Sequence, residues 1–264
     1  MQCNHTLPFR RGKHGRFITQ STARMPAGTV ISVSLCEIFC YSHRMNRTAL
    51  ALRILYEDNH LLAADKPAGL LTQADDTGHA ALEDLLREHV RAARGKPGGV
   101  FLHAAHRLDR EVGGVGLFAL TSKALSRLNA QQREGAWVKR YRAWVQGGPS
   151  DERGLLTHWL VHASHRAQAA TAGAPDAKEC RLDYEVVRKD AGRTLLAILL
   201  HTGRYHQIRA QLAAAGWPVL GDSKYGATTP WPAGGLALRH VALSLEHPVK
   251  HTPLVLEAPN TEFR

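Results

Sequence analysis

Acidic residues, cysteines and long apolar runs are all scarce in this sequence. Its 264 residues contain 23 Asp and Glu against 34 Lys and Arg, a net charge of +11, and this surplus favours a nucleic acid or another polyanion as partner. The four cysteines do not form a disulfide framework in a chain of this length, so we expect a reducing compartment, the cytoplasm. No apolar run reaches the roughly 18 residues that a membrane span requires, so we expect a soluble protein with no membrane partner.

Residues 1–48 differ in composition from the rest of the chain. Ahead of Glu37, the first acid, they contain the basic residues Arg10, Arg11, Lys13, Arg16 and Arg24. This fits a transit peptide, a basic RNA-binding arm, or translation begun upstream of a true start at Met45, and we favour the last. Cys36, Cys40 and His43 would supply three zinc ligands but no clear fourth. We expect residues 1–48 to be a poorly ordered extension and residues 49–264 to form one domain.

The pattern of apolar and turn residues predicts short strands with a few helices between them. Strands are expected at 52–57, 60–65, 115–120, 138–145, 181–189 and 193–201, and helices at 80–94, 121–133 and 205–215. The Ala- and Gly-rich stretch 163–177 has no period and is expected to be a loop. Strands and helices do not alternate regularly, and no internal repeat is visible, so the sequence predicts an α+β fold.

A single aspartate, Asp109, stands among basic residues in the run His106-Arg107-Leu108-Asp109-Arg110. It follows a short apolar stretch, and a loop that leaves a strand end holds a side chain in place while keeping it reachable. Taken from the residues alone, an Arg–Asp structural pair explains this run better than a catalytic carboxylate does. A metal site at His103, His106 and Asp109 needs a helix, which Leu108 and the following glycines disfavour.

A second basic motif, Thr202-Gly203-Arg204-Tyr205-His206-Gln207-Ile208-Arg209, stands where a strand is expected to give way to a helix. We expect Gly203 to permit this turn with a positive φ. Arg204 either contacts phosphate or faces solvent. Arg209 is five residues further on, so the two arginines need not share a face.

These motifs together resemble the RluA family of RNA pseudouridine synthases. The resemblance extends from about residue 52 to residue 258, and any one motif would be weak, but their number, order and spacing match. The remaining motifs that carry it are Asp65-Lys66-Pro67-Ala68-Gly69, Lys139-Arg140-Tyr141, Gly221-Asp222-Ser223-Lys224-Tyr225-Gly226 and His247-Pro248.

The resemblance implies a fold, a reaction and a set of site residues. The fold is a mixed, largely antiparallel sheet with flanking helices and a central catalytic cleft. The reaction is isomerisation of uridine to pseudouridine in structured rRNA or tRNA, by a monomer without metal or other cofactor. Asp109 is the implied nucleophile, Arg209 its partner, and Tyr141 the ring that stacks on the uracil. The implied substrate-binding residues are Arg107, which fills the space left by the extruded base, Leu200, which packs under the uracil, Arg204 and Arg110.

Core packing is the alternative role for Tyr141 and Leu200, and two departures from the family pattern keep other functions open. After Asp-Arg the family usually has Thr-Ser-Gly, where this chain has Val112, Gly113 and Gly114, and many members have His in place of Gln211. A non-catalytic RNA-binding protein or RNA chaperone on the same fold is therefore the alternative function. A basic hydrolase that uses the same aspartate is a third.

Overall fold

The structure is a computed structural model that describes residues 52–95, 98–260 and 263. The basic segment 1–48, the zinc ligands considered at Cys36, Cys40 and His43, and Met45 lie outside the described residues. Within the described ranges, no helix is long and apolar enough to cross a membrane.

The predicted helices and strands all appear in their predicted order, together with strands at 103–104, 153–163, 166–170, 238–246 and 253–257 that the sequence analysis did not predict. The helices are α1 (Leu82–Arg94), α2 (Ser122–Arg133) and α3 (Gln207–Ala214), with a short 3₁₀ helix η2 (Ser223–Tyr225). The strands are β1 (Arg53–Glu57), β2 (Leu61–Lys66), β3 (His103–Ala104), β4 (Gly113–Ala119), β5 (Val138–Gln146), β6 (Arg153–Ala163), β7 (Arg166–Ala170), β8 (Lys178–Asp190), β9 (Arg193–Leu200), β10 (Leu238–Glu246) and β11 (Pro253–Glu257).

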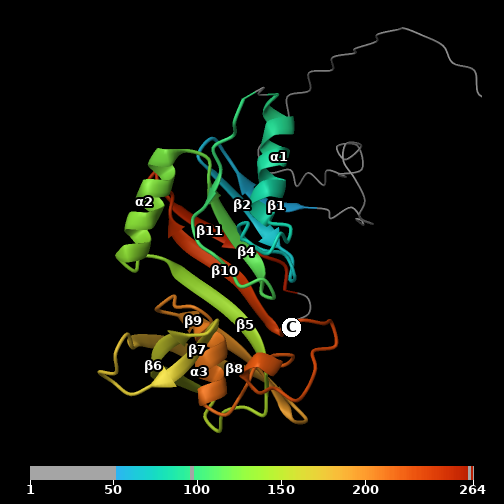
Figure 1. Ribbon diagram of the computed structural model, residues 1–264, viewed down its shortest axis with the longest axis vertical. Helices are drawn as coiled ribbons and strands as arrows, with labels where there is room; N and C mark the ends of the chain where they lie inside the picture. Colours follow the sequence, from blue (N-terminus) through green and yellow to red (C-terminus); the bar gives the residue numbers. More distant parts are fainter. Residues whose placement is uncertain (1–51, 96–97, 261–262, 264) are drawn as a thin grey trace, which may run out of the picture. The chain divides into compact units, whose positions relative to one another are not determined.

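All these strands belong to one sheet, in which β1-β2-β4-β10-β5-β9-β8-β6-β7 lie side by side (Figure 1). Strand β11 adds to β10, and β3 adds to β4. The pairing of β4 with β10 is parallel, and the other pairings are antiparallel. The α+β fold and the mixed, largely antiparallel sheet are thus confirmed.

Helices α1 and α2 cover opposite faces of the part of the sheet that contains β2 and β4. Because side chains alternate along a strand, Leu62 and Phe118 pack with α1, while their neighbours Leu61 and Leu117 pack with α2. Each helix buries its apolar side there, and Thr121 caps the start of α2 by accepting a hydrogen bond from a backbone N–H. Both faces of β4 are therefore buried, which fixes the strand that follows Asp109.

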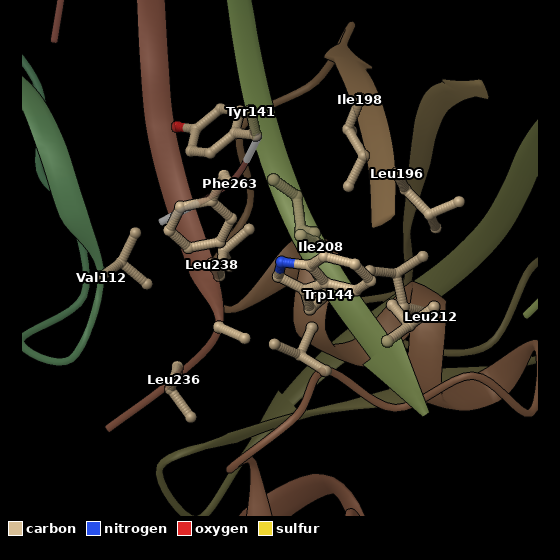
Figure 2. Packing of buried hydrophobic residues seen from close by; sticks show 14 of the residues in the cluster. Val112, Tyr141, Trp144, Leu196, Ile198, Ile208, Leu212, Leu236, Leu238 and Phe263 are labelled. Atoms are coloured by element: carbon tan, nitrogen blue, oxygen red, sulfur yellow. The ribbon is translucent and has the colours of Figure 1, made fainter. Parts of the chain in front are cut away.

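Helix α3 lies closest to β6 and β7, and it also contributes to an apolar cluster with residues of β5, β9 and β8. Its residues Ile208 and Leu212 belong to the same apolar cluster as Tyr141 and Ile198, which face each other across β5 and β9 (Figure 2). The alternation along β5 places Lys139 on the same face as Tyr141. Arg140 and Arg142, which alternate with Lys139 and Tyr141 in the sequence, point to the opposite face.

The prediction of a loop at residues 163–177 is wrong in its first part, because β7 (Arg166–Ala170) pairs with β6 there. The two strands are joined by Ser164 and His165, which have φ values of 45° and 61°. Two successive positive φ values are typical of a tight hairpin turn, but Gly and Asn are the usual residues there. The sequence therefore lacks the usual signal for this turn.

A carboxylate in the turn between β1 and β2 ties that turn to the connection between β10 and β11. Asp58 accepts hydrogen bonds from the backbone N–H groups of His60 and Leu61, at 2.8 and 2.9 Å, and from Tyr56 Oη at 2.9 Å. Lys250 Nζ lies 2.7 Å and His247 Nε2 3.0 Å from its Oδ2. Burial alone would raise the pKa of Asp58, but these bonds outweigh it and lower the pKa.

We predict that Asp58→Asn lowers the free energy of unfolding by about 2 kcal/mol at pH 7, because an amide cannot accept all these bonds. A carboxylate whose pKa is lowered by folding stabilises the protein above its unfolded pKa, near 4. That contribution is lost as the pH falls further. Urea unfolding from pH 7 to pH 3 should therefore show the wild-type advantage shrinking below about pH 4. The same exchange at exposed Asp76 is the control, and an equal effect there would contradict the prediction.

Candidate active site

The loop that carries Asp109 is held in place on both sides of that residue. Thr72 Oγ1 donates to the carbonyl oxygen of Leu108 at 3.0 Å and accepts from its N–H at 3.1 Å. Lys66, fully buried, donates to the carbonyl oxygen of Arg110 at 2.9 Å and to two carbonyls of the turn that follows it, at 2.5 and 3.1 Å. Burial lowers the pKa of Lys66 to about 8. Two segments distant in sequence therefore fix the backbone around Asp109.

In the loop after Asp109, close packing surrounds the residues that stand where the family usually has Thr-Ser-Gly. Val112 is buried in the same apolar cluster as α3 and points into it (Figure 2). A Cβ on Gly113 would lie 2.8 Å from Nη1 of Arg239, so the guanidinium occupies the space of a side chain there. Gly114 has φ 119°, and a Cβ on it would lie 2.0 Å from the carbonyl oxygen of His240. In this chain the loop after Asp109 is therefore held by close packing around Val112, Gly113 and Gly114.

Arg209 holds the Asp109 carboxylate from the buried side of the site. Its Nη1 donates to Asp109 Oδ2 at 3.1 Å, while Nε and Nη2 donate to the two oxygens of Asp222, at 2.6 and 2.8 Å. The side chains of Arg209 and Asp222 are only 7% and 1% exposed, against 25% for Asp109. Burial by itself lowers the pKa of Arg209, but the two carboxylates outweigh it and raise that pKa. Asp222 therefore fixes the guanidinium, which in turn orients a carboxylate that solvent can reach.

His206 is the third group at the Asp109 carboxylate. Its Nε2 lies 3.6 Å from Asp109 Oδ2 and accepts a hydrogen bond from Arg209 at 3.2 Å, so the ring proton is on Nδ1, 3.1 Å from Tyr225 Oη. Burial lowers the pKa of His206 to about 4, so the ring is neutral at pH 7. The prediction of a positive φ at Gly203 is wrong, since His206 has φ 50° at the start of α3 instead.

Tyr141 lies near this carboxylate, and Leu200 lies on the same face of the sheet as Tyr141. Both side chains are only 7% exposed, and Leu200 pairs across the sheet with Lys139, two residues before Tyr141. The Tyr141 ring stacks on His240 with centroids 4.5 Å apart. Burial raises the pKa of Tyr141, and the nearby negative charge of Asp109 raises it further. The phenol is therefore protonated and next to the carboxylate.

The other three candidate residues are exposed and do not contact Asp109. Arg107 has no hydrogen bond or ion pair with any described residue, and Arg204 is exposed just before α3. Arg110 Nε donates to Glu111 Oε1 at 2.8 Å. Of the arginines named from the sequence, the structure thus brings Arg209 to the carboxylate and leaves the others at the surface.

Four residues that position the site were not identified from the sequence as site residues. Lys66 and Asp222 belong to motifs that the sequence displays, so their presence in those motifs was an available signal. Thr72 belongs to no motif, and nothing in the sequence marks it. His206 stands in the second basic motif, but its contact with Asp109 depends on the left-handed backbone at that residue.

Comparison with known proteins identifies what the chain resembles. A family model described as RNA pseudouridylate synthase matches residues 60–214. The dual-specificity RNA pseudouridine synthase RluA of Escherichia coli is 30% identical over 213 residues, which cover 79% of this chain and 93% of that protein. The ribosomal large subunit pseudouridine synthase D of Nitrosomonas europaea is 34% identical over 221 residues, covering 80% of this chain but only 62% of that protein.

Two solved human structures share the fold. Human RNA Pseudouridylate Synthase Domain Containing 4 superposes with a TM-score of 0.67 at 22% identity, over 80% of this chain and 89% of that one. Human RNA Pseudouridylate Synthase Domain Containing 1 gives a TM-score of 0.62 at 23% identity, over 79% and 83%. At these identities the likeness concerns the fold alone.

We predict that Asp222→Asn lowers the free energy of unfolding by about 3–5 kcal/mol, because it removes one partner of a buried ion pair. The double variant Arg209→Met/Asp222→Leu should cost less than Asp222→Asn, since it leaves no uncompensated buried charge on either residue. Denaturant unfolding measures both.

The matched control for this experiment is Asp183→Asn. Asp183 pairs with His201 at 2.8 Å, but its side chain is 46% exposed, and exposed pairs contribute about 0–1 kcal/mol. If Asp222→Asn cost no more than Asp183→Asn, the pair would not be what holds Arg209.

Proposed function

The chain belongs to the RNA pseudouridylate synthase family, and from this premise we propose that it isomerises specific uridines to pseudouridine in structured rRNA or tRNA, with Asp109 as the nucleophile. The observation that carries the proposal is the Asp109 carboxylate itself. It is partly exposed, ion-paired with buried Arg209, and adjacent to Tyr141. We propose further that the protein acts as a monomer in the cytoplasm.

The reaction needs only groups that the site can supply. The N1–C1′ bond of the nucleoside breaks, the base rotates, and C5 bonds to C1′; C5 loses its proton and N1 gains one. Because the product is an isomer of the substrate, with no net oxidation or reduction and no group gained or lost, the isomerisation needs no redox cofactor, ATP or metal. An ionised carboxylate serves as the nucleophile that adds to the nucleoside and is later expelled. Arg209 orients the carboxylate, since its own guanidinium is fixed by Asp222.

A uridine inside structured RNA has to leave its stack before it reaches Asp109, at a cost of a few kcal/mol. The proposal assigns Tyr141 to stack on the extruded uracil, where an aromatic face contributes roughly 1–3 kcal/mol. Leu200 would pack against the same base, because it lies on the same face of the sheet. Arg107 is exposed two residues before the nucleophile, which suits it to fill the vacated position.

The remaining arginines fit contacts to the RNA backbone. Arg110 and Arg204 are exposed at the two loops that meet at Asp109, and the chain as a whole carries a charge of +11. Contacts of this kind release counterions, so the affinity for RNA should fall as the salt concentration rises. RNA shape and charge, more than a linear sequence, would then select the substrate.

We predict that the protein releases tritium from rRNA or tRNA transcripts labelled at C5 of uridine, because C5 loses its hydrogen when it bonds to C1′. Asp109→Asn should lower the rate at least roughly 10³-fold while the fold and RNA binding persist, since it removes only the nucleophile. The exchange Asp76→Asn, in an exposed loop, should leave the rate unchanged.

Three results would contradict this function. RNA binding by the wild type without tritium release would favour a non-catalytic RNA-binding protein. Free uracil or cleaved RNA as the product would indicate a hydrolase. Full activity of Asp109→Asn would show that another residue is the nucleophile.

A further inference from the structure

Lys139 lies on the face of the sheet that also carries Tyr141 and Leu200, and its ammonium has no hydrogen-bond acceptor among the described residues. It lies on β5, two residues before Tyr141 and opposite Leu200 in the register of the sheet. Its ammonium makes no hydrogen bond or ion pair with any described residue, and its one contact is with the ring of Trp137, 5.7 Å from the centroid. Burial lowers the pKa of Lys139, and no neighbouring carboxylate offsets this.

The groups around Lys139 do not neutralise it. His240 is buried and His106 partly buried, and their pKa values are lowered first by burial and also by neighbouring positive charge, Lys139 included. His240 Nδ1 donates a hydrogen bond to the carbonyl oxygen of Val115 at 2.8 Å, and because burial lowers the pKa of His240 to about 4, the ring is neutral at pH 7. His106 Nε2 accepts from a backbone N–H, so its proton is on Nδ1. No acid stands among these neighbours.

A partly buried ammonium without an acceptor is costly, because it loses hydration and gains nothing in exchange. Such an ammonium is well placed to donate hydrogen bonds to an acceptor on a bound ligand. Among the described residues, the interaction that compensates this cost is with the ring of Trp137 at 5.7 Å, which contributes roughly 0.5–2 kcal/mol. An anionic oxygen would contribute more, since hydrogen bonds to charged groups are the strong ones.

The Lys139 ammonium lies directly beside the backbone of Gly203. A Cβ built on this exposed glycine would lie 3.4 Å from Lys139 Nζ, in van der Waals contact with it, so a side chain there would occupy space that a ligand of the ammonium could use. The Gly203 N–H has no hydrogen-bond partner among the described residues. Its φ is not positive, so conformational freedom is not why a glycine is needed. Close approach of a ligand to backbone is the other common reason for a glycine.

We propose that Lys139 and the backbone at Gly203 bind a phosphodiester group of the RNA next to the extruded uridine. This inference rests on the proposed function, which supplies RNA as the ligand. Two residues along a strand span about 7 Å, so a base stacked at Tyr141 would leave its own or the adjoining phosphate within reach of Lys139. Of the acceptors in RNA, the phosphate oxygen is the one that carries a full charge to match the ammonium.

The proposal is tested by the salt dependence of RNA binding in Lys139→Met, which keeps the apolar stem and removes the charge. With a transcript that the wild type modifies, or otherwise one that it binds, affinity should fall roughly tenfold or more. The slope of log K against log salt between 50 and 200 mM should shrink by about 0.7, the value for one phosphate on a single strand. Lys123→Met, at an exposed position on α2, should change neither.

Gly203→Ala provides a second test that preserves the charge. Its methyl group should weaken RNA binding in the wild-type background but add little in the Lys139→Met background, because both changes act on one phosphate contact. Lys139→Met should also be at least as stable as the wild type in urea, since it removes an uncompensated charge. A purely structural lysine would give the opposite result.

The outcomes separate this proposal from the proposed function. An unchanged salt slope in Lys139→Met, with or without a lower rate of tritium release, overturns the phosphate site and would place the ammonium on the uracil or elsewhere. Additive effects of the two substitutions also overturn it. A reduced slope in a protein that releases no tritium supports the phosphate site and rejects the proposed function.

Discussion

The buried ion pair between Arg209 and Asp222 is the constraint on which the site depends. A guanidinium this deeply buried is stable only if its donors are met, and Asp222 takes two of them. The remaining Nη1 is then fixed in space, and Asp109 meets it from the solvent side. The Asp109 carboxylate is thus accessible to solvent but held by a guanidinium that is almost fully buried. Because a buried guanidinium without its carboxylate partner is costly, Arg209 stays in the position that Asp222 gives it.

The backbone around Asp109 is also held in place, by hydrogen bonds from side chains to backbone groups. Lys66 and Thr72 hold the residues on either side through carbonyl oxygens and an N–H. Val112 enters the apolar core, and Arg239 fills the space beside Gly113. In this chain, which has Val112, Gly113 and Gly114 where the family usually has Thr-Ser-Gly, the loop is therefore held by packing as well as by these hydrogen bonds.

Local sequence signals were sufficient where an element is specified by its own residues. The strands around the turn at Asp58, the helix capped by Thr121 and the helix after His206 all appear near their predicted places. Strands β6 and β7 were missed, since their hairpin turn at Ser164 and His165 uses neither Gly nor Asn. A strand that is stabilised chiefly by pairing with a neighbouring strand is difficult to predict from its own residues.

The sequence by itself determined the motifs and the α+β class, because both are recorded in residue types at fixed spacings, and the family resemblance that the motifs carry made Asp109 and Arg209 the candidates. Only the tertiary structure decided which basic side chain pairs with the Asp109 carboxylate. Arg107, Arg110 and Arg204 are close to it in the chain or in its motifs, yet they are exposed, while Asp222, which no spacing links to Asp109, completes the site. The alternation of side chains likewise sends Lys139 to the active-site face and Arg140 away from it. Contacts across the sheet follow from register and burial, and neither is a property of a local run of residues.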